Sequence, residues 1–241
     1  MILVSGGCSF SCFNYTWPFH LAEKLNYIHH PTGWVSSGNQ FISRRVIHKV
    51  MDLLNSNVDA STILVGIMWS GPDRFEVYTE DPVVYDVLSV PRISEKGLCV
   101  WPDHDKKGKW VIMNSYFENK LAKEYYKTFY NETQSMVQTL ENVLRTQWFL
   151  EKHNINYFMT SYTSEVFNFE NINKSQINHL QESIDWRKFL PIDGCYEWVR
   201  DNSANPFLHP PDRHPSRAQH IDFVDNLVIP ILVERGYAKV S

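Results

Sequence analysis

The sequence predicts an α/β fold of three layers, in which helices cover both faces of a central parallel sheet. Short apolar runs of strand length alternate with longer segments whose apolar residues recur at helical spacing. The run at 62–68 is apolar almost throughout, which is typical of a strand buried on both faces of a parallel sheet. Strands that alternate with helices in this way favour a parallel sheet between two helical layers.

The first third of the chain predicts two strands and two helices. A strand is expected at Ile2–Val4. Thr16, followed by a proline in the first turn, indicates a helix start. A second helix is expected over 38–54, where apolar residues fall at helical intervals, and the strand at 62–68 follows it.

The second half predicts two more helices and one strand. The tetrapeptide at 131–134 resembles a capping box and should begin a long helix. A strand is expected over 155–160. The last helix should start close to Ser216, with a kink or restart at Pro230 and a stop at Gly236.

One compact domain, 1–241, is expected, because 241 residues with 43% hydrophobic content can bury one sizeable core. The stretch at about 70–116 is less regular and reads as an insertion after the third strand. Such an insertion often forms a lid or pocket wall, but its aromatic residues equally suit a satellite core. These aromatic residues are Phe75, Tyr78, Tyr85, Trp101 and Trp110.

Ser9, Asp212 and His214 are candidate catalytic residues. A serine hydroxyl is a weak nucleophile that needs a base to take its proton and a third group to orient that base. In an extended segment Asp212 and His214 point the same way, so the spacing permits an oriented imidazole. The alternatives are a turn-capping serine, a satisfied loop histidine and a turn-forming aspartate.

The predicted fold places these residues together. In parallel α/β sheets, sites form at the carboxyl ends of the strands. Ser9, the Gly38 loop and Ser70 follow strand ends or lie in the loops there, and His214 lies in the loop before the last helix.

Three segments resemble the conserved blocks of the SGNH (GDSL-type) hydrolases, in the family's order. Residues 7–11, Gly-Cys-Ser-Phe-Ser, are similar to the first block, with Cys8 where many members have aspartate. Residues 36–42 resemble the second block, and 212–216 the last, with a second histidine, His220, beyond it. The resemblance is closest to uncharacterised SGNH-like proteins of phages and marine bacteria. It implies a flavodoxin-like sheet and a serine hydrolase site.

The resemblance also implies an oxyanion hole formed by the N–H groups of Ser9 and Gly38. The third block's asparagine is missing, and Ser70 lies nearest to its position. Loss of one oxyanion donor typically costs roughly two to three orders of magnitude in rate. Further side chains expected near the pocket are Ser11, Asn39, Trp69, Asp73 and Arg74.

Composition argues against several other classes. The net charge of −4, without a long run of either sign, argues against a nucleic-acid partner. The Asp103-His104-Asp105 cluster lacks further ligands at zinc-site spacing, so neither a metal nor a cofactor is expected. Four scattered cysteines, with no signal peptide or membrane-spanning run, predict a reduced cytoplasmic protein without a membrane partner.

Three functional hypotheses follow. The first is an ester hydrolase that acts on a small acyl ester, with an O-acetylated carbohydrate as the substrate class that the resemblance implies. The second is an inactive SGNH-like protein that binds a ligand or belongs to an assembly. The third is an O-acyltransferase, which shares the first chemical step with a hydrolase.

Overall fold

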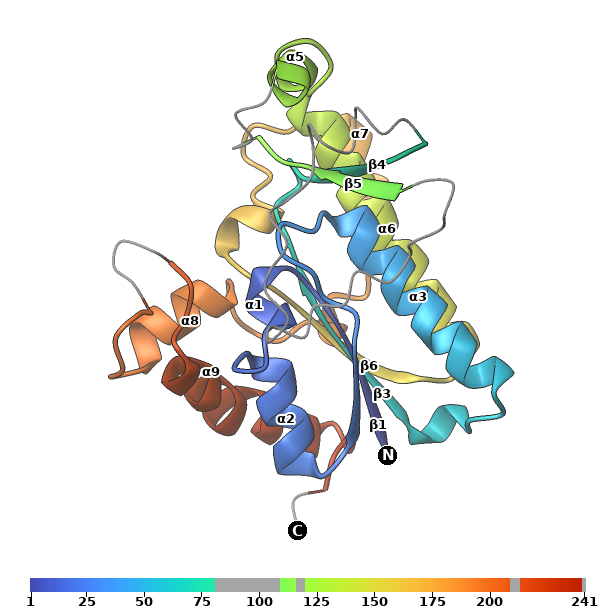
Figure 1. Ribbon diagram of the computed structural model, residues 1–241, viewed down its shortest axis with the longest axis vertical. Coiled ribbons are helices and arrows are strands. Elements are labelled where there is room, and N and C mark those ends of the chain that lie inside the picture. The colour runs from blue at the N-terminus through green and yellow to red at the C-terminus, as the bar shows by residue number, and fades with distance from the viewer. Residues whose placement is uncertain (81–108, 116–119, 209–212, 240–241) are drawn as a thin grey trace.

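The computed structural model describes residues 1–80, 109–115, 120–208 and 213–239. Its main sheet has four parallel strands in the order β2-β1-β3-β6 (Figure 1). These strands are β1 (Ile2–Gly6), β2 (Ile28–Pro31), β3 (Ile63–Trp69) and β6 (Asn156–Ser161). The predicted α/β class with a central parallel sheet is confirmed.

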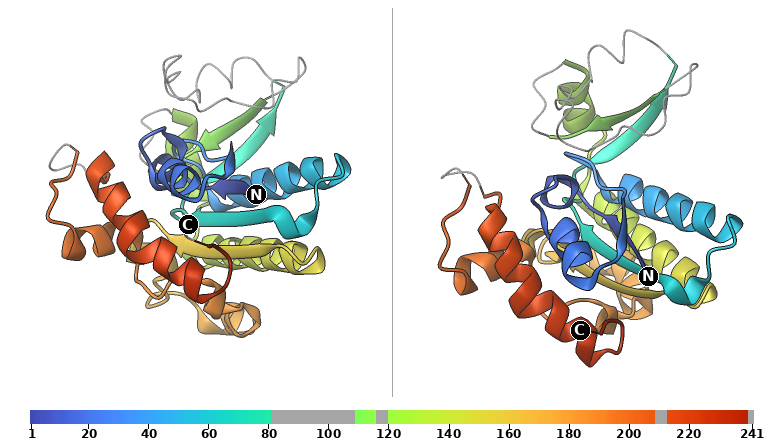
Figure 2. Two further views of the ribbon diagram at one scale, coloured as in Figure 1. Left: turned by 90° about the horizontal axis from the view of Figure 1, so that it is seen from below. Right: turned by 60° about the horizontal axis from the view of Figure 1, so that its bottom comes forward.

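Helices flank the sheet on both faces. The main helices are α2 (Trp17–Leu25), α3 (Asn39–Asn55), α5 (Lys120–Thr128), α6 (Glu132–Lys152), α7 (Lys174–Ser183), α8 (Cys195–Asn202), α9 (Arg217–Phe223) and α10 (Ile229–Glu234). Shorter segments are α1 (Ser9–Cys12), the 3₁₀ turns η1 (Ala60–Thr62), η2 (Ser164–Phe167) and η3 (Trp186–Lys188), and the π-helix η4 (Val224–Val228). Helices α3 and α6 lie on one side of the sheet, and α2, α9 and α10 on the other (Figure 2).

Strand β3 shows why two cores form. Its side chains alternate between the faces of the sheet. Val65 and Ile67 belong to the cluster under α3 and α6, whereas Leu64 and Met68 belong to the cluster under α2 and α9. All seven residues of β3 are buried, as the continuous apolar run predicts.

Gly66 leaves the space that two large aromatic side chains fill. An added Cβ would lie 2.8 Å from the Phe158 ring and 2.9 Å from the Trp17 ring. We expect Gly66→Ala to lower the free energy of unfolding by about 1–3 kcal/mol, because overpacking forces buried side chains out of their rotamers. Urea denaturation measures this loss. In the double variant Gly66→Ala/Phe158→Leu the loss should be smaller than the sum of the single losses, and strict additivity would contradict the explanation.

The helix boundaries follow their capping signals. Asn131 caps α6 by accepting a hydrogen bond from the Gln134 N–H at 3.1 Å. A full capping box joins Ser216 and Gln219 at the start of α9. The π-helix η4 joins α9 to α10, and Pro230 lies in the first turn of α10.

The stretch after β3 is more regular than expected. Strands β4 (Phe75–Thr79) and β5 (Lys109–Met113) form an antiparallel pair beside the main sheet (Figure 1). Phe75 packs with Met113 and with aromatic residues of α5, so a satellite core exists here. Tyr85 and Trp101 lie outside the described residues, and the role of lid or pocket wall stays a prediction.

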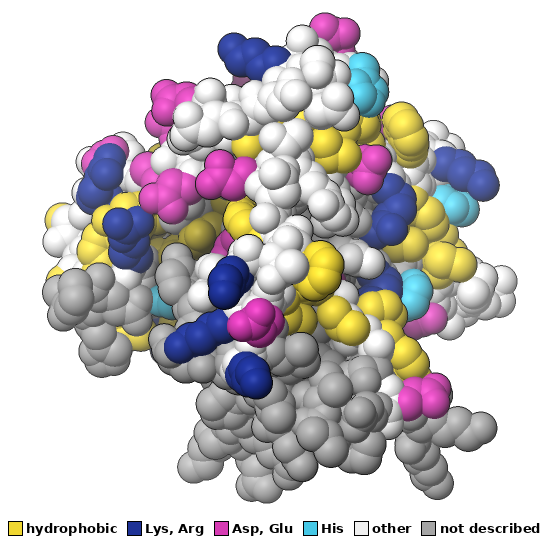
Figure 3. All heavy atoms as spheres, turned by 90° about the horizontal axis from the view of Figure 1, so that it is seen from above, with side chains coloured by type: hydrophobic (Ala, Val, Ile, Leu, Met, Phe, Trp, Pro, Cys, Tyr) yellow, Lys and Arg dark blue, Asp and Glu magenta, His cyan; other side chains and the backbone are white. Residues whose placement is uncertain are grey.

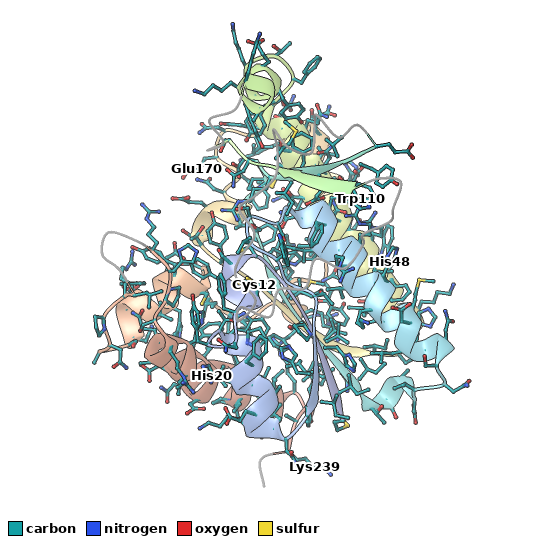
Figure 4. The ribbon with its side chains drawn as sticks, in the orientation of Figure 1. Cys12, His20, His48, Trp110, Glu170 and Lys239 are labelled. Carbon is teal, nitrogen blue, oxygen red and sulfur yellow. The ribbon has the colours of Figure 1, made fainter. Side chains whose placement is uncertain are left out.

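The β4–β5 pair packs against the first half of α3. The Arg44 guanidinium lies over the ring of Trp110, 3.4 Å from its centroid, and Trp110 is labelled on β5 in Figure 4. Among the described residues, no helix combines the length and the apolar character needed to cross a membrane.

Candidate functional site

A tight turn presents Ser9 at the carboxyl end of β1. Gly7 has a φ of 157°, and a side chain there would overlap the Ser11 hydroxyl, so the turn requires glycine. The chain then enters α1, whose first residue is Ser9 and whose last, Cys12, is labelled near the middle of Figure 4. Ser9 is partly exposed, while its neighbours Cys8 and Phe10 are buried.

His214 reaches Ser9 from the far end of the chain. The Ser9 Oγ and the His214 Nε2 are 2.8 Å apart. The imidazole packs on the ring of Phe10 with centroids 4.9 Å apart, and its backbone carbonyl accepts a hydrogen bond from the Leu208 N–H. A serine that contacts Nε2 at this distance has the geometry of a nucleophile with its general base. Asp212 lies outside the described residues, so its orienting role stays a prediction.

The sheet topology marks the same place. Strand order reverses at β1, because β2 lies on one side of it and β3 on the other. Ligands of open α/β sheets bind beyond the carboxyl ends of the strands at such a switch point. Ser9 follows β1 and Ser70 follows β3, so both predicted residues lie at this point.

Asn39 is a structural residue of the site rather than a pocket residue. Its side chain amide donates to the Ser70 carbonyl at 2.9 Å, and its Oδ1 accepts from the Ser70 N–H at 2.7 Å. The same amide donates to Thr139 on α6 at 3.1 Å. Asn39 is only 3% exposed, so it joins the start of α3 to the end of β3 instead of facing a ligand.

Gly38 is the N-cap of α3, and its N–H donates to the Glu76 Oε1 at 3.1 Å. The backbone of Arg74 lies so close to Gly38 that a side chain at position 38 would overlap the Arg74 carbonyl oxygen. The N–H expected to hold an oxyanion is therefore already engaged by a buried carboxyl group. This geometry contradicts the expected role of Gly38.

Glu76 is a buried acid with an unusual pKa. Burial raises the pKa of Glu76 to about 8, against the opposing effects of Arg44 and of hydrogen bonds from the Gly38 and Phe41 N–H groups. The folded protein therefore keeps a proton that the unfolded chain releases above its ordinary pKa of 4.5. The proton on Glu76 stabilises the folded state fully below pH 4.5, and this stabilisation is lost as the pH rises to about 8.

We expect Glu76→Gln to remove this loss, because the amide stays neutral at every pH. Relative to the variant, the wild type should lose a few kcal/mol of unfolding free energy between pH 5 and 8. Urea unfolding at both values measures the difference, with the exposed Glu182→Gln as the matched control. Parallel pH profiles for the wild type and Glu76→Gln would contradict the raised pKa.

Three predicted pocket residues have other partners. Ser11 is fully buried and accepts a hydrogen bond from the Trp17 indole at 2.9 Å. Trp69 is also fully buried, in the core under α3 and α6. Asp73 accepts hydrogen bonds from Ser115 through its carboxylate and from an α5 tyrosine through its carbonyl. The structure therefore does not support Ser11 and Trp69 as pocket residues, and Asp73 binds to the insertion.

Arg74 lies within the site. Its Nη1 donates to the Ser70 Oγ at 2.8 Å, and its guanidinium lies over the ring of Tyr162, 5.3 Å from the centroid. Tyr162 meets Phe10 edge to face at 5.4 Å, and Phe10 contacts His214. The sequence offered no signal for Tyr162 beyond its position directly after β6.

A cavity of about 200 Å³ is lined by none of these residues. Carboxylates, amides and a phenol supply its polar groups. The lining residues are Pro72, Tyr130, Glu132, Met136, Glu165, Asn168, Asn171 and Ile172. Glu165 pairs with Arg213, the neighbour of His214, at 3.5 Å. Acidic side chains gather on one side of this end of the molecule, with Lys and Arg side chains beside them (Figure 3).

Other polar groups of the chain are buried in the fold. Ser5 and His29 form a second serine–histidine pair at 2.8 Å between β1 and β2, and burial lowers the pKa of His29 to about 4. Burial also lowers the pKa of His220 to about 3. Cys8 packs in the core under α2, and Cys99 lies outside the described residues. No group of three or more His, Cys, Asp or Glu side chains in the described ranges is placed to hold a metal.

Fold and site together define an α/β protein with a parallel sheet and a serine–histidine pair at its topological switch point. The chain belongs to DUF6071, a family of unknown function, whose family model matches residues 11–235. The match includes His214 and begins two residues after Ser9. No curated protein matches the chain.

Proposed function

We propose that the protein is a serine hydrolase of small acyl esters. The observation that carries the proposal is the 2.8 Å contact between the Ser9 Oγ and the His214 Nε2. The two residues are 205 positions apart, and the contact lies where α/β sheets bind ligands.

The proposed reaction proceeds in two halves. The Ser9 oxygen bonds to the acyl carbon while its proton passes to His214, and the carbonyl π electrons move to the carbonyl oxygen. The intermediate collapses, the alcohol leaves with the proton from His214, and an acyl-enzyme remains. Water then attacks the acyl carbon, again through His214, and releases the acid and free Ser9. Asp212 is the proposed orienting residue.

The strand order supports an SGNH-like fold for this site. The sheet order β2-β1-β3-β6 corresponds to the first four strands of the flavodoxin-like order 2-1-3-4-5. Together with the motif resemblance at residues 7–11 and 212–216, this order favours the hydrolase over unrelated α/β functions.

An O-acylated carbohydrate is the proposed substrate class. The serine–histidine pair does not line the cavity, which is linked to it only through the Glu165–Arg213 ion pair next to His214. The cavity is lined by Glu132, Glu165, Asn168 and Asn171, whose carboxylates and amides are suitable hydrogen-bond partners for sugar hydroxyls. Its volume of about 200 Å³ suits one small group rather than a long acyl chain.

A fluorophosphonate probe tests the nucleophile directly. We expect the probe to label wild-type protein on Ser9, located by peptide mass spectrometry, because it reacts with serines that a neighbouring base activates. Ser9→Ala should abolish the labelling, and Ser5→Ala should not. Absence of labelling on folded wild-type protein, or labelling elsewhere than Ser9, would overturn the proposal.

One observation favours a non-catalytic binding protein as the second candidate. The Gly38 N–H is bonded to Glu76, and the family's asparagine is missing, so two usual oxyanion donors are not available. In that case the cavity alone would bind a ligand. An acyltransferase would label like a hydrolase, and added alcohol acceptors would then divert the acyl group from the free acid to a new ester.

A further inference from the structure

Arg74 carries a buried guanidinium, and one of its hydrogen-bond donors is not satisfied by the fold. Its Nε is buried and has no hydrogen-bond partner among the described residues. A buried donor without a partner costs about 1–3 kcal/mol, so its retention requires an explanation. In the described ranges no carboxylate forms an ion pair with the guanidinium, and the neighbouring Asp73 binds Ser115 instead.

The charge of Arg74 is maintained despite its burial. Burial lowers the pKa of Arg74, but the side chains of Cys8, Tyr162 and Asp73 outweigh this effect and raise it. A guanidinium that stays charged in a poorly solvated place acts strongly on any negative charge that forms nearby.

The surroundings of Arg74 place that charge at the same end of the sheet as the serine–histidine pair. The guanidinium is influenced electrostatically by Cys8, the residue before Ser9. It also bonds to the hydroxyl of Ser70 at the end of β3. On its other side, the contacts through Tyr162 and Phe10 lead to the imidazole. The charge thus lies at the carboxyl ends of β3 and β6.

We propose that the Arg74 guanidinium stabilises the oxyanion, in place of the Gly38 N–H and the missing asparagine amide. The proposal rests on the proposed ester hydrolase function. When the Ser9 oxygen bonds to the acyl carbon, the electron pair that moves to the carbonyl oxygen becomes a full negative charge. The Nε–H of Arg74 supplies a charged donor for it, and charged donors form stronger hydrogen bonds than neutral amides.

Ser70 completes this arrangement. The Ser70 oxygen accepts the hydrogen bond from Arg74, and Ser70 is itself fully buried, so it supports the guanidinium rather than contacting the substrate. The bond also holds the guanidinium at the end of β3, where Asn39 fixes the Ser70 peptide on both sides. The donor is therefore positioned before the reaction begins, which is what oxyanion stabilisation requires.

Kinetics of Arg74→Ala on a neutral short-chain aryl ester test this role. We expect kcat to fall roughly 10²- to 10³-fold with little change in KM, because the contact forms only in the transition state. Guanidinium chloride at low millimolar concentration should restore part of kcat in Arg74→Ala. It should not restore Ser9→Ala, and Arg145→Ala, which removes an arginine between α3 and α6, should show neither loss nor response.

Each rate is normalised to the concentration of folded protein, measured by near-UV circular dichroism, and Arg74→Lys provides a second variant if Arg74→Ala fails to fold. An unchanged kcat in either folded variant would overturn the proposal. So would a loss confined to KM, or one confined to anionic esters, which would indicate recognition of a substrate anion. If the wild-type protein shows no Ser9-dependent hydrolysis, the proposed function itself fails. If the wild type hydrolyses the ester through Ser9 and the Arg74 variants are equally active, only the inference about Arg74 fails.

Discussion

Replacement of Ser9 by alanine is expected to lower kcat for a short-chain aryl ester by roughly 10³- to 10⁶-fold, the range for loss of a serine nucleophile. The hydroxyl is the atom that bonds to the acyl carbon, and it lies 2.8 Å from the His214 Nε2. Initial rates at saturating ester measure the loss. The fold should persist, because Ser9 is partly exposed and supplies no side-chain cap to α1.

The chain offers a matched control for this variant. Ser5 makes the same kind of contact with His29, also at 2.8 Å, but it is fully buried within the sheet. Ser5→Ala therefore removes a serine–histidine hydrogen bond without touching the proposed site, and it should keep the wild-type kcat per folded molecule. Equal losses in the two variants would mean that Ser9 acts through stability, and a Ser9→Ala variant as active as wild type would end the hydrolase proposal.

Replacement of His214 by alanine is expected to reduce kcat by a similar factor, because the serine then has no base for its proton. The double variant Ser9→Ala/His214→Ala should be about as slow as each single variant, since residues that act as one unit give strongly non-additive losses. The measurement is a double-mutant cycle on kcat at constant pH.

The exposed His179 on α7 provides the histidine control, and His179→Ala should leave kcat unchanged. Losses that multiply in the double variant would show that the two side chains act separately. That result would contradict the mechanism in which the Ser9 proton passes to His214, even if each single variant is slow.

The sequence predicts the interior strands and long helices well because each has a repeating signal. The apolar run of β3 and the helical spacing in α3 and α6 extend over many residues, so single exceptions do not hide them. By contrast, β2 is a short edge strand of sequence Ile-His-His-Pro, whose mixed polarity gives no period. The β4–β5 pair was missed because its two strands are separated by a long stretch without a recognisable turn.

The site was predicted in part, and each error has a geometric cause. An extended chain would put Ser11 on the same side as Ser9, but residues 9–12 form a helical turn in which residues two apart point in different directions. Trp69 continues the alternation of Val65 and Ile67, so the period of the strand already assigned it to the core.

The engagement of Gly38 was beyond prediction. Its partner Glu76 lies 38 residues away on a strand without a clear pattern, and no local rule couples a glycine to a distant buried acid. The pairing of Ser9 with His214 was predictable because both belong to motifs whose chemistry requires contact.

The double hydrogen bond of Asn39 has a consequence for how a substrate enters. By bonding to both the N–H and the C=O of Ser70 and to Thr139, one amide ties α3, α6 and the end of β3 into a single rigid body. That half of the site cannot open without breaking three buried hydrogen bonds. The Ser70 side of the site is therefore set before any ligand arrives, and a substrate must fit it as it stands.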